Sequence, residues 1–135
     1  MTYNINLVLQ ISSGEHPDPK PYGHLYDYFT ILTTAADVEE ERNTIAKIDE
    51  ILQLETLEEK WNFAEHEFLG NIIDDNYKYY CWLDAQQYTP RLVLNYATGE
   101  LYLVYVLDSF NPRFKIEKGN LLEMLSDWEK YLSSR

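Results

Sequence analysis

The 135-residue sequence predicts an α+β fold: one domain in which an antiparallel sheet of about five strands packs against two or three amphipathic helices. Three observations lead to this prediction. Several short segments alternate apolar and polar residues, and longer segments repeat apolar residues at helical spacing. The elements follow one another roughly as ββααβββα, which groups strands and helices instead of alternating them. The length is close to the commonest domain size, so a single domain is expected over residues 1–135.

The N-terminal part is predicted to form two strands. Every second residue from Tyr3 to Ile11 is apolar, which is the period of a strand with one buried face. Residues 12–24 hold three prolines and two glycines, so we expect a long loop without helix. Residues 25–33 are predicted as the second strand, paired with the first.

Two helices are predicted in the middle of the chain. Asp37–Glu40 has the form of a capping box and opens a helix that extends to about Leu54. Its apolar stripe is Val38, Ile45, Ile48, Ile51 and Leu52. A second capping box, Thr56–Glu59, begins a helix that Gly70 is expected to stop. Its apolar stripe is Leu57, Trp61, Ala64 and Phe68. Residues 61–69 are also compatible with a strand.

The second half of the chain predicts strands and a last helix. Lys78–Leu83 is expected to be a strand. Two further strand-like runs, Arg91–Asn95 and Glu100–Leu107, are joined by four residues that end in Gly99, which is typical of a β-hairpin. Asn120 is predicted to cap a final amphipathic helix.

Acidic residues are concentrated in the middle of the chain. The net charge is −12, and the segment from Asp37 to Asp75 alone holds 13 acidic and three basic residues. Such a field repels nucleic-acid phosphates and anionic lipid, and it attracts a basic partner. Neither nucleic-acid nor membrane binding is therefore expected. Solubility alone would also account for acidic helices.

The sequence carries no signal for export or for membrane insertion. The longest apolar run, Leu101–Leu107, is far shorter than the roughly 20 residues needed to cross a bilayer. The N-terminus lacks the pattern of a secretory signal, and the single cysteine is typical of a reducing compartment. A cytoplasmic protein is expected.

No catalytic, cofactor or metal site is predicted. His16, His24 and His66 do not have the spacing of metal ligands. Cys81 lies between two aromatic residues in a predicted strand, where a core role is expected. The sequence has no phosphate-binding loop and no nucleophile elbow. Carboxylate pairs such as Asp74–Asp75 leave a carboxylate-dependent hydrolase as a lesser alternative.

The leading hypothesis is a non-enzymatic, acidic and tyrosine-rich protein-binding module. Its acidic residues would mask a basic partner, as an immunity protein or inhibitor masks a nuclease toxin, and the chain has 12 tyrosines that suit either half-exposed strands or binding hot spots. The alternative is a structural or scaffolding subunit of a homo-oligomer, such as a homodimer, or of a larger complex. The residues expected to bind the partner are Glu39, Glu40, Asp49, Glu58, Asp74 and Asp75 for charge, with Tyr77 and Tyr79 as aromatic anchors.

The C-terminal third resembles the end of SUKH-type bacterial immunity proteins. The resemblance rests on the hairpin from Arg91 to Leu107 and the amphipathic stretch Leu121–Leu132, a sheet closed by a helix. It implies an immunity role. The predicted N-terminal strand pair and the proline-rich loop depart from that family's pattern, so membership is not inferred.

Overall fold

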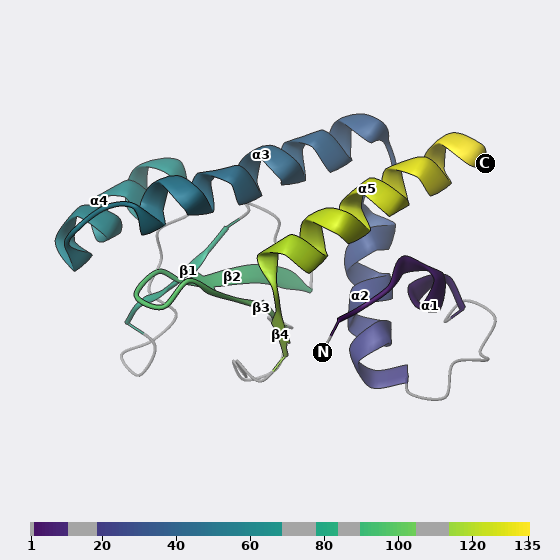
Figure 1. Ribbon diagram of the computed structural model, residues 1–135, viewed down its shortest axis with the longest axis horizontal. Coiled ribbons are helices and arrows are strands. Elements are labelled where there is room, and N and C mark those ends of the chain that lie inside the picture. The colour runs from purple at the N-terminus through teal and green to yellow at the C-terminus, as the bar shows by residue number, and fades with distance from the viewer. Residues whose placement is uncertain (1, 11–18, 69–77, 84–89, 105–113) are drawn as a thin grey trace. The chain divides into compact units, whose positions relative to one another are not determined.

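The computed structural model describes residues 2–10, 19–68, 78–83, 90–104 and 114–135 (Figure 1). The described elements are α1 (Ile5–Gln10), α2 (Pro19–Ile31), α3 (Ala35–Leu52), α4 (Leu57–Glu67), β1 (Tyr80–Trp82), β2 (Arg91–Asn95), β3 (Glu100–Val104), β4 (Lys115–Ile116) and α5 (Lys118–Ser134). The α+β class is confirmed. The order of elements differs from the prediction, because four helices precede the four described strands.

The chain forms two compact units. The first contains residues 1–42 and 116–135, and the second contains residues 43–115. The boundaries therefore fall within α3 and within β4. That the two units make a single domain stays a prediction.

The strand predicted over residues 3–11 is wrong, because residues 5–10 form α1. The backbone N–H of Asn6 donates to Asn4 Oδ1 at 2.7 Å, and the N–H of Val8 donates to the Asn4 carbonyl at 3.1 Å. Asn4 thus caps a helix. Ile5 and Val8 are buried, three residues apart on one helical face. Over six residues, an apolar alternation is compatible with this spacing as well as with a strand.

The predicted strand at residues 25–33 is also wrong, and so is the helix-free loop over its described part. Residues 19–31 form α2. Pro19 and Pro21 lie in its first turn, where backbone N–H groups have no intrahelical acceptor, so neither proline removes a helical hydrogen bond. The buried residues Tyr22, Leu25 and Phe29 recur at helical spacing. Loop residues 12–18 lie outside the described residues.

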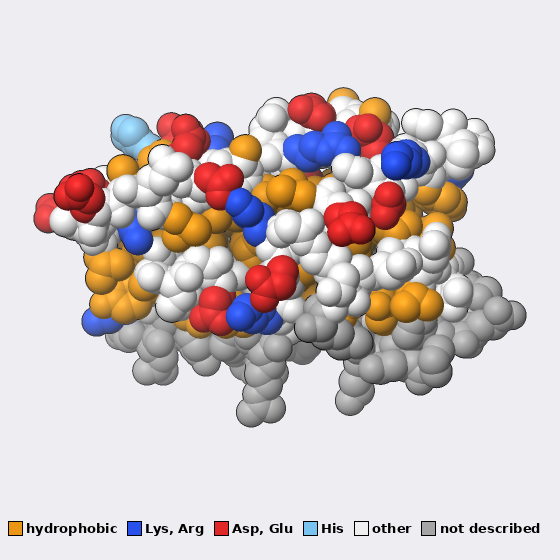
Figure 2. Space-filling model, viewed as in Figure 1, with side chains coloured by type: hydrophobic (Ala, Val, Ile, Leu, Met, Phe, Trp, Pro, Cys, Tyr) orange, Lys and Arg blue, Asp and Glu red, His pale blue; other side chains and the backbone are white. Residues whose placement is uncertain are grey.

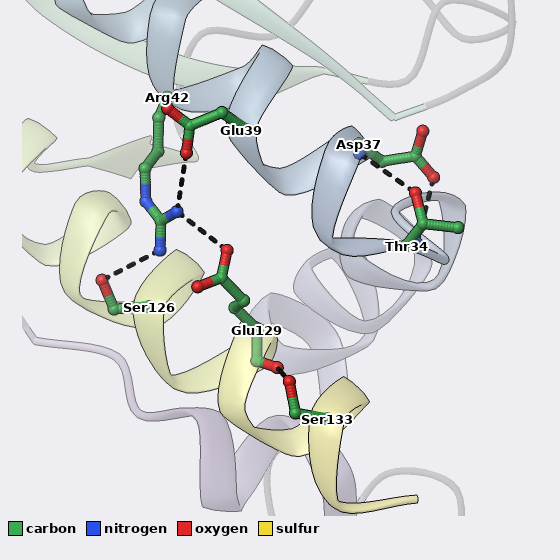
Figure 3. Close-up of polar contacts among 7 residues, drawn as sticks. All are labelled: Thr34, Asp37, Glu39, Arg42, Ser126, Glu129 and Ser133. Carbon is green, nitrogen blue, oxygen red and sulfur yellow. Dashed lines mark hydrogen bonds and ion pairs between the residues drawn. The ribbon is translucent and has the colours of Figure 1, made fainter.

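Helix α3 begins earlier than its predicted cap. The backbone N–H of Asp37 donates to Thr34 Oγ1 at 3.1 Å, and Asp37 Oδ2 accepts from the backbone N–H of Thr34 at 3.2 Å (Figure 3). The capping box is therefore Thr34–Asp37 and not Asp37–Glu40. The two residues of the box are only three positions apart. The predicted cap is wrong because Asp37 occupies the third position of the helix and Thr34 the cap.

Asn120 does not cap α5, contrary to the prediction. The helix begins at Lys118, and the buried side chain of Asn120 bonds to the backbone of Tyr3 instead. Further along α5, Trp128 Nε1–H donates to the carbonyl of Leu32 at 2.7 Å. These two contacts tie α5 to the N-terminal segment and to the end of α2 within the first unit.

In the second unit, the end of α3 and α4 form a helical hairpin. Lys47 Nζ lies 3.1 Å from Glu67 Oε2, which joins the two helices by an ion pair. Thr56 caps α4 as predicted, with its Oγ1 accepting from the backbone N–H of Glu59 at 3.1 Å. Residues 61–67 are helical, which decides between the two predictions for this segment. The predicted stop at Gly70 lies outside the described residues.

The sheet has the order β1-β2-β3-β4, with β1 and β3 each antiparallel to β2. The predicted hairpin is confirmed over its described residues; its turn ends at Gly99, whose φ is +84°. One face of the sheet carries Cys81, Leu92, Leu94, Leu101 and Leu103, all buried. Figure 1 shows α4 beside the sheet, and the ring centroids of Trp61 in α4 and Tyr96 in the hairpin turn lie 6.5 Å apart. None of the described helices combines the length and apolar character needed to cross a bilayer.

Candidate functional site

The turn between α3 and α4 and the helix ends beside it are rich in acidic residues. The segment Asp49–Glu59, here called the acidic tip, contains five acidic residues and no basic residue. All five acidic side chains are exposed: Asp49, Glu50, Glu55, Glu58 and Glu59. Figure 2 shows acidic side chains at the end of the unit where α3 meets α4, beside apolar ones.

Two leucines are exposed at the same place. Leu52 is 36% exposed and Leu57 is 42% exposed, and they are the large apolar side chains that the described part of the chain leaves exposed. Leu52 also rests against the hairpin turn, since a Cβ built on Gly99 would lie 3.1 Å from Leu52 Cδ1. The leucines therefore sit at the border between the core and the solvent, with the acidic side chains of the tip on both sides of them in sequence.

Four of the five carboxylates of the acidic tip have no basic partner among the described residues. Glu50, Glu55, Glu58 and Glu59 form no ion pair with a basic side chain of the described residues. Glu58 and Glu59 lie in the first turn of α4, where the helix dipole favours negative charge. Glu50 lies in the last turn of α3, which has no basic residue and where the dipole disfavours negative charge.

Two of the predicted binding residues, Glu39 and Glu40, belong to the first unit instead. Both are exposed on α3. Glu39 is held by Arg42 at 3.1 Å, and Arg42 also contacts Glu129 at 2.9 Å and Ser126 Oγ at 3.3 Å (Figure 3). Hydrogen bonding to Glu129, above all, raises the pKa of Arg42. Glu39 is thus part of a network that joins α3 to α5, and its charge is partly balanced there.

Asp49 and Glu58 are the two predicted residues that the acidic tip brings together. Tyr79 is half-buried in the same unit, and its ring packs edge-on against Tyr96 at 5.9 Å. Lys78 Nζ lies 5.0 Å from the Tyr79 ring centroid. Tyr79 therefore already has packing partners within the protein. The other three predicted residues, Asp74, Asp75 and Tyr77, lie outside the described residues.

The tyrosines that the structure describes do not all lie on an exposed face. Several of them are core residues: Tyr3, Tyr22, Tyr28, Tyr96 and Tyr102. The first three lie in the first unit and the last two in the second. Because all five are buried, they act mainly as large core side chains with a polar end.

Sequence reasoning missed the exposure of Leu52 and Leu57, which it assigned to the core stripes of their helices. Their position distinguishes these two leucines from the buried residues of the same stripes. Both flank a turn, where the end of a helix extends beyond the surface against which the helix packs. Leu52 follows the buried Ile51, and Leu57 is the first residue of α4.

The described side chains were compared with two kinds of reactive site, a metal site and a cysteine nucleophile. No group of three His, Cys, Asp or Glu residues there lies close enough to hold a metal ion. Cys81 is buried, as predicted, and burial raises the pKa of its thiol to about 12, so the thiol is neutral at pH 7. His16 lies outside the described residues.

No known protein family, curated protein or solved structure matches the chain significantly. The resemblance to SUKH-type immunity proteins therefore rests on the quoted residues alone.

Proposed function

We propose that the protein is a non-enzymatic binding module that engages a basic protein surface through the acidic tip. The observation that carries this proposal is the exposure of Leu52 and Leu57 inside an eleven-residue segment with five acidic residues and no basic one. Exposed apolar groups with a polar rim are typical of interfaces, where the centre excludes water and the rim fixes the partner's orientation.

Electrostatics supports a basic partner. A concentrated negative field steers a basic surface into contact and raises the association rate. The position of Glu50 against the helix dipole adds to this argument, because a surface selected for stability alone would favour a basic residue there.

The class of partner follows from the same chemistry. A nuclease toxin holds phosphate in a basic site, and carboxylates can occupy that site in place of phosphate. An immunity or inhibitor role in the cytoplasm is therefore the form of the proposal that we favour. Two acidic tips would repel each other, which disfavours a homodimer formed through this surface.

The experiment uses a basic amphipathic helical peptide of lysine and leucine as the probe, with binding to the full chain measured by fluorescence anisotropy at low and high salt. The proposal predicts tight binding at low salt and a steep loss as the Debye length falls from about 30 Å at 0.01 M to about 3 Å at 1 M. The double variant Glu55→Lys, Glu58→Lys should weaken binding by about tenfold or more.

The matched control is Glu123→Lys with Asp127→Lys, which changes the net charge equally at exposed positions of the first unit. It should weaken binding much less. Salt-independent binding, or equal losses in the two double variants, would contradict the proposal.

A further inference from the structure

Trp61 in α4 differs from the other two tryptophans in its polar contacts. The guanidinium carbon of Arg91 lies 4.2 Å from the ring centroid of Trp82, and Trp128 donates its indole N–H to the Leu32 carbonyl. Trp61 is half-buried, and within the described part of the chain it has neither a cation over its ring nor an acceptor for its N–H. No buried side-chain nitrogen of that part lacks a hydrogen-bond partner, so the N–H of Trp61 is open to water.

The indole of Trp61 is held against the hairpin turn. Its ring centroid lies 6.5 Å from that of Tyr96, which is buried and whose hydroxyl donates to the Lys78 carbonyl at 3.0 Å. The exposed Leu57 precedes Trp61 by one helical turn, so the two side chains form one apolar stripe. A tryptophan that is fixed in place and partly exposed beside apolar surface has the character of an interface hot spot.

Two exposed carboxylates flank Trp61. Glu58 lies three residues before it and Glu65 four residues after it, and side chains at these spacings are neighbours on a helix surface. Neither carboxylate forms an ion pair with a basic side chain of the described residues. Lys60, the lysine of α4, is two positions from Glu58 and five from Glu65, which places it on a different side of the helix.

Arginine is the side chain whose chemistry matches this arrangement. A guanidinium can stack flat on an indole while its in-plane N–H groups donate to a carboxylate beside the ring. A lysine ammonium is a compact and more strongly hydrated charge, so it gains less from the same ring. The stacking of Arg91 on Trp82 shows the guanidinium half of this arrangement within the protein itself.

We propose that the interface of the acidic tip continues along α4 and that Trp61 binds an arginine of the partner. The guanidinium lies on the indole and donates to Glu58 or Glu65, and the apolar side chains next to that arginine contact Leu57. This inference rests on the proposed function, because the acidic tip must first attract a basic protein. It adds that the partner presents an arginine at this position, where a lysine would bind less well.

The test uses two helical peptides of one sequence, built from leucine with either lysine or arginine. Fluorescence anisotropy measures their binding to the full chain at the same low salt concentration. The parent should bind the arginine peptide about three- to tenfold more tightly than the lysine peptide. Trp61→Leu keeps an apolar helix former at this position and should lose most of that preference, whereas Trp61→Phe should retain part of it.

A second variant tests the carboxylate without altering the packing of the indole. Glu65→Gln changes an exposed residue outside the acidic tip, and it should weaken binding of the arginine peptide more than that of the lysine peptide. Glu123→Gln is the matched control, because it removes the same charge from an exposed position of the first unit. It should leave the preference for arginine in place.

The outcomes separate this proposal from the proposed function. If neither peptide binds the parent, both proposals fall. If the parent binds the two peptides equally, or if Trp61→Leu keeps the full preference, the arginine site is overturned and the acidic tip still binds a basic partner. A second copy of the chain on this face would give a concentration-dependent mass in light scattering that Trp61→Leu lowers, and this result would also overturn the arginine site.

Discussion

The side-chain amide of Asn120 makes two hydrogen bonds to the backbone of Tyr3. Asn120 Oδ1 accepts from the Tyr3 N–H at 2.7 Å, and Asn120 Nδ2 donates to the Tyr3 carbonyl at 2.9 Å, across 117 positions of sequence. Both residues are buried. The amide thus satisfies the backbone of Tyr3 as a neighbouring strand would, and it fixes the segment before α1 to the first turn of α5.

The variant Asn120→Ala should therefore be costly. It removes the two buried hydrogen bonds between Asn120 and the backbone of Tyr3, for which we expect a loss of about 2–4 kcal/mol in the free energy of unfolding. Urea unfolding followed by far-UV circular dichroism measures it. Asn62→Ala, at an exposed position of α4, is the control and should change stability by less than about 0.5 kcal/mol. If the two variants lowered the free energy of unfolding equally, the Asn120–Tyr3 hydrogen bonds would not contribute to stability.

The Thr34–Asp37 capping box predicts a pH dependence. Hydrogen bonding, first of all from the backbone N–H of Thr33, lowers the pKa of Asp37. A carboxyl whose pKa is lower in the folded state stabilises the fold above its unfolded pKa of about 3.9, and this contribution is lost as pH falls through the folded pKa. Asp37→Asn should then be less stable than the parent at neutral pH, and the two stabilities should converge in acid. Unfolding curves across this pH range test this, and a difference that persists unchanged in acid would contradict it.

Local signals explain which elements could be predicted from the sequence. Thr56 caps α4 through its own neighbours, and Gly99 closes a hairpin of adjacent strands, so both were predictable. The N-terminal elements were not, because the six residues of α1 are too few to separate the two periodicities. Prolines usually break helices, but they are tolerated in the first turn of α2. The residue at which that turn begins depends on packing against the rest of the unit.

The candidate site was predictable only in its charge. The acidity of Asp49 and Glu58 is a property of the sequence, whereas the exposure of Leu57 depends on which surface its helix covers. The same limit applies to Glu39. Its partner Arg42 also pairs with Glu129, and this contact joins α3 to α5 over a long sequence separation. Side chains that share a helix can be grouped from spacing alone, and side chains on distant helices cannot.

The exposure of Leu57 predicts a contrast with its neighbours in the core. Ile48→Ala should lower the free energy of unfolding by about 2–5 kcal/mol, because Ile48 is buried and the change leaves a cavity. Leu57→Ala should cost clearly less, since much of that side chain is already in water, and it should weaken binding of the basic probe peptide. Chemical denaturation and anisotropy measure the two effects. A Leu57→Ala variant as unstable as Ile48→Ala would place Leu57 in the core and remove it from the proposed interface.

The hairpin turn makes the final prediction. Gly99 adopts a φ of +84°, which side chains other than glycine rarely tolerate, and an added Cβ would lie 3.1 Å from Leu52 Cδ1. Gly99→Ala should therefore lower the free energy of unfolding by about 1–2 kcal/mol. Gly119→Ala is the matched control, because Gly119 lies in the first turn of α5, and nothing is within 4 Å of the position its Cβ would take. Alanine is the better helix former, so this variant should be neutral or more stable by up to about 1 kcal/mol. Because Leu52 belongs to the acidic tip, Gly99→Ala should also displace that side chain and alter binding of the probe peptide, whereas Gly119→Ala should not. If both glycine variants had the same stability, the hairpin turn would not need glycine, and its contact with Leu52 would not be a constraint on the site.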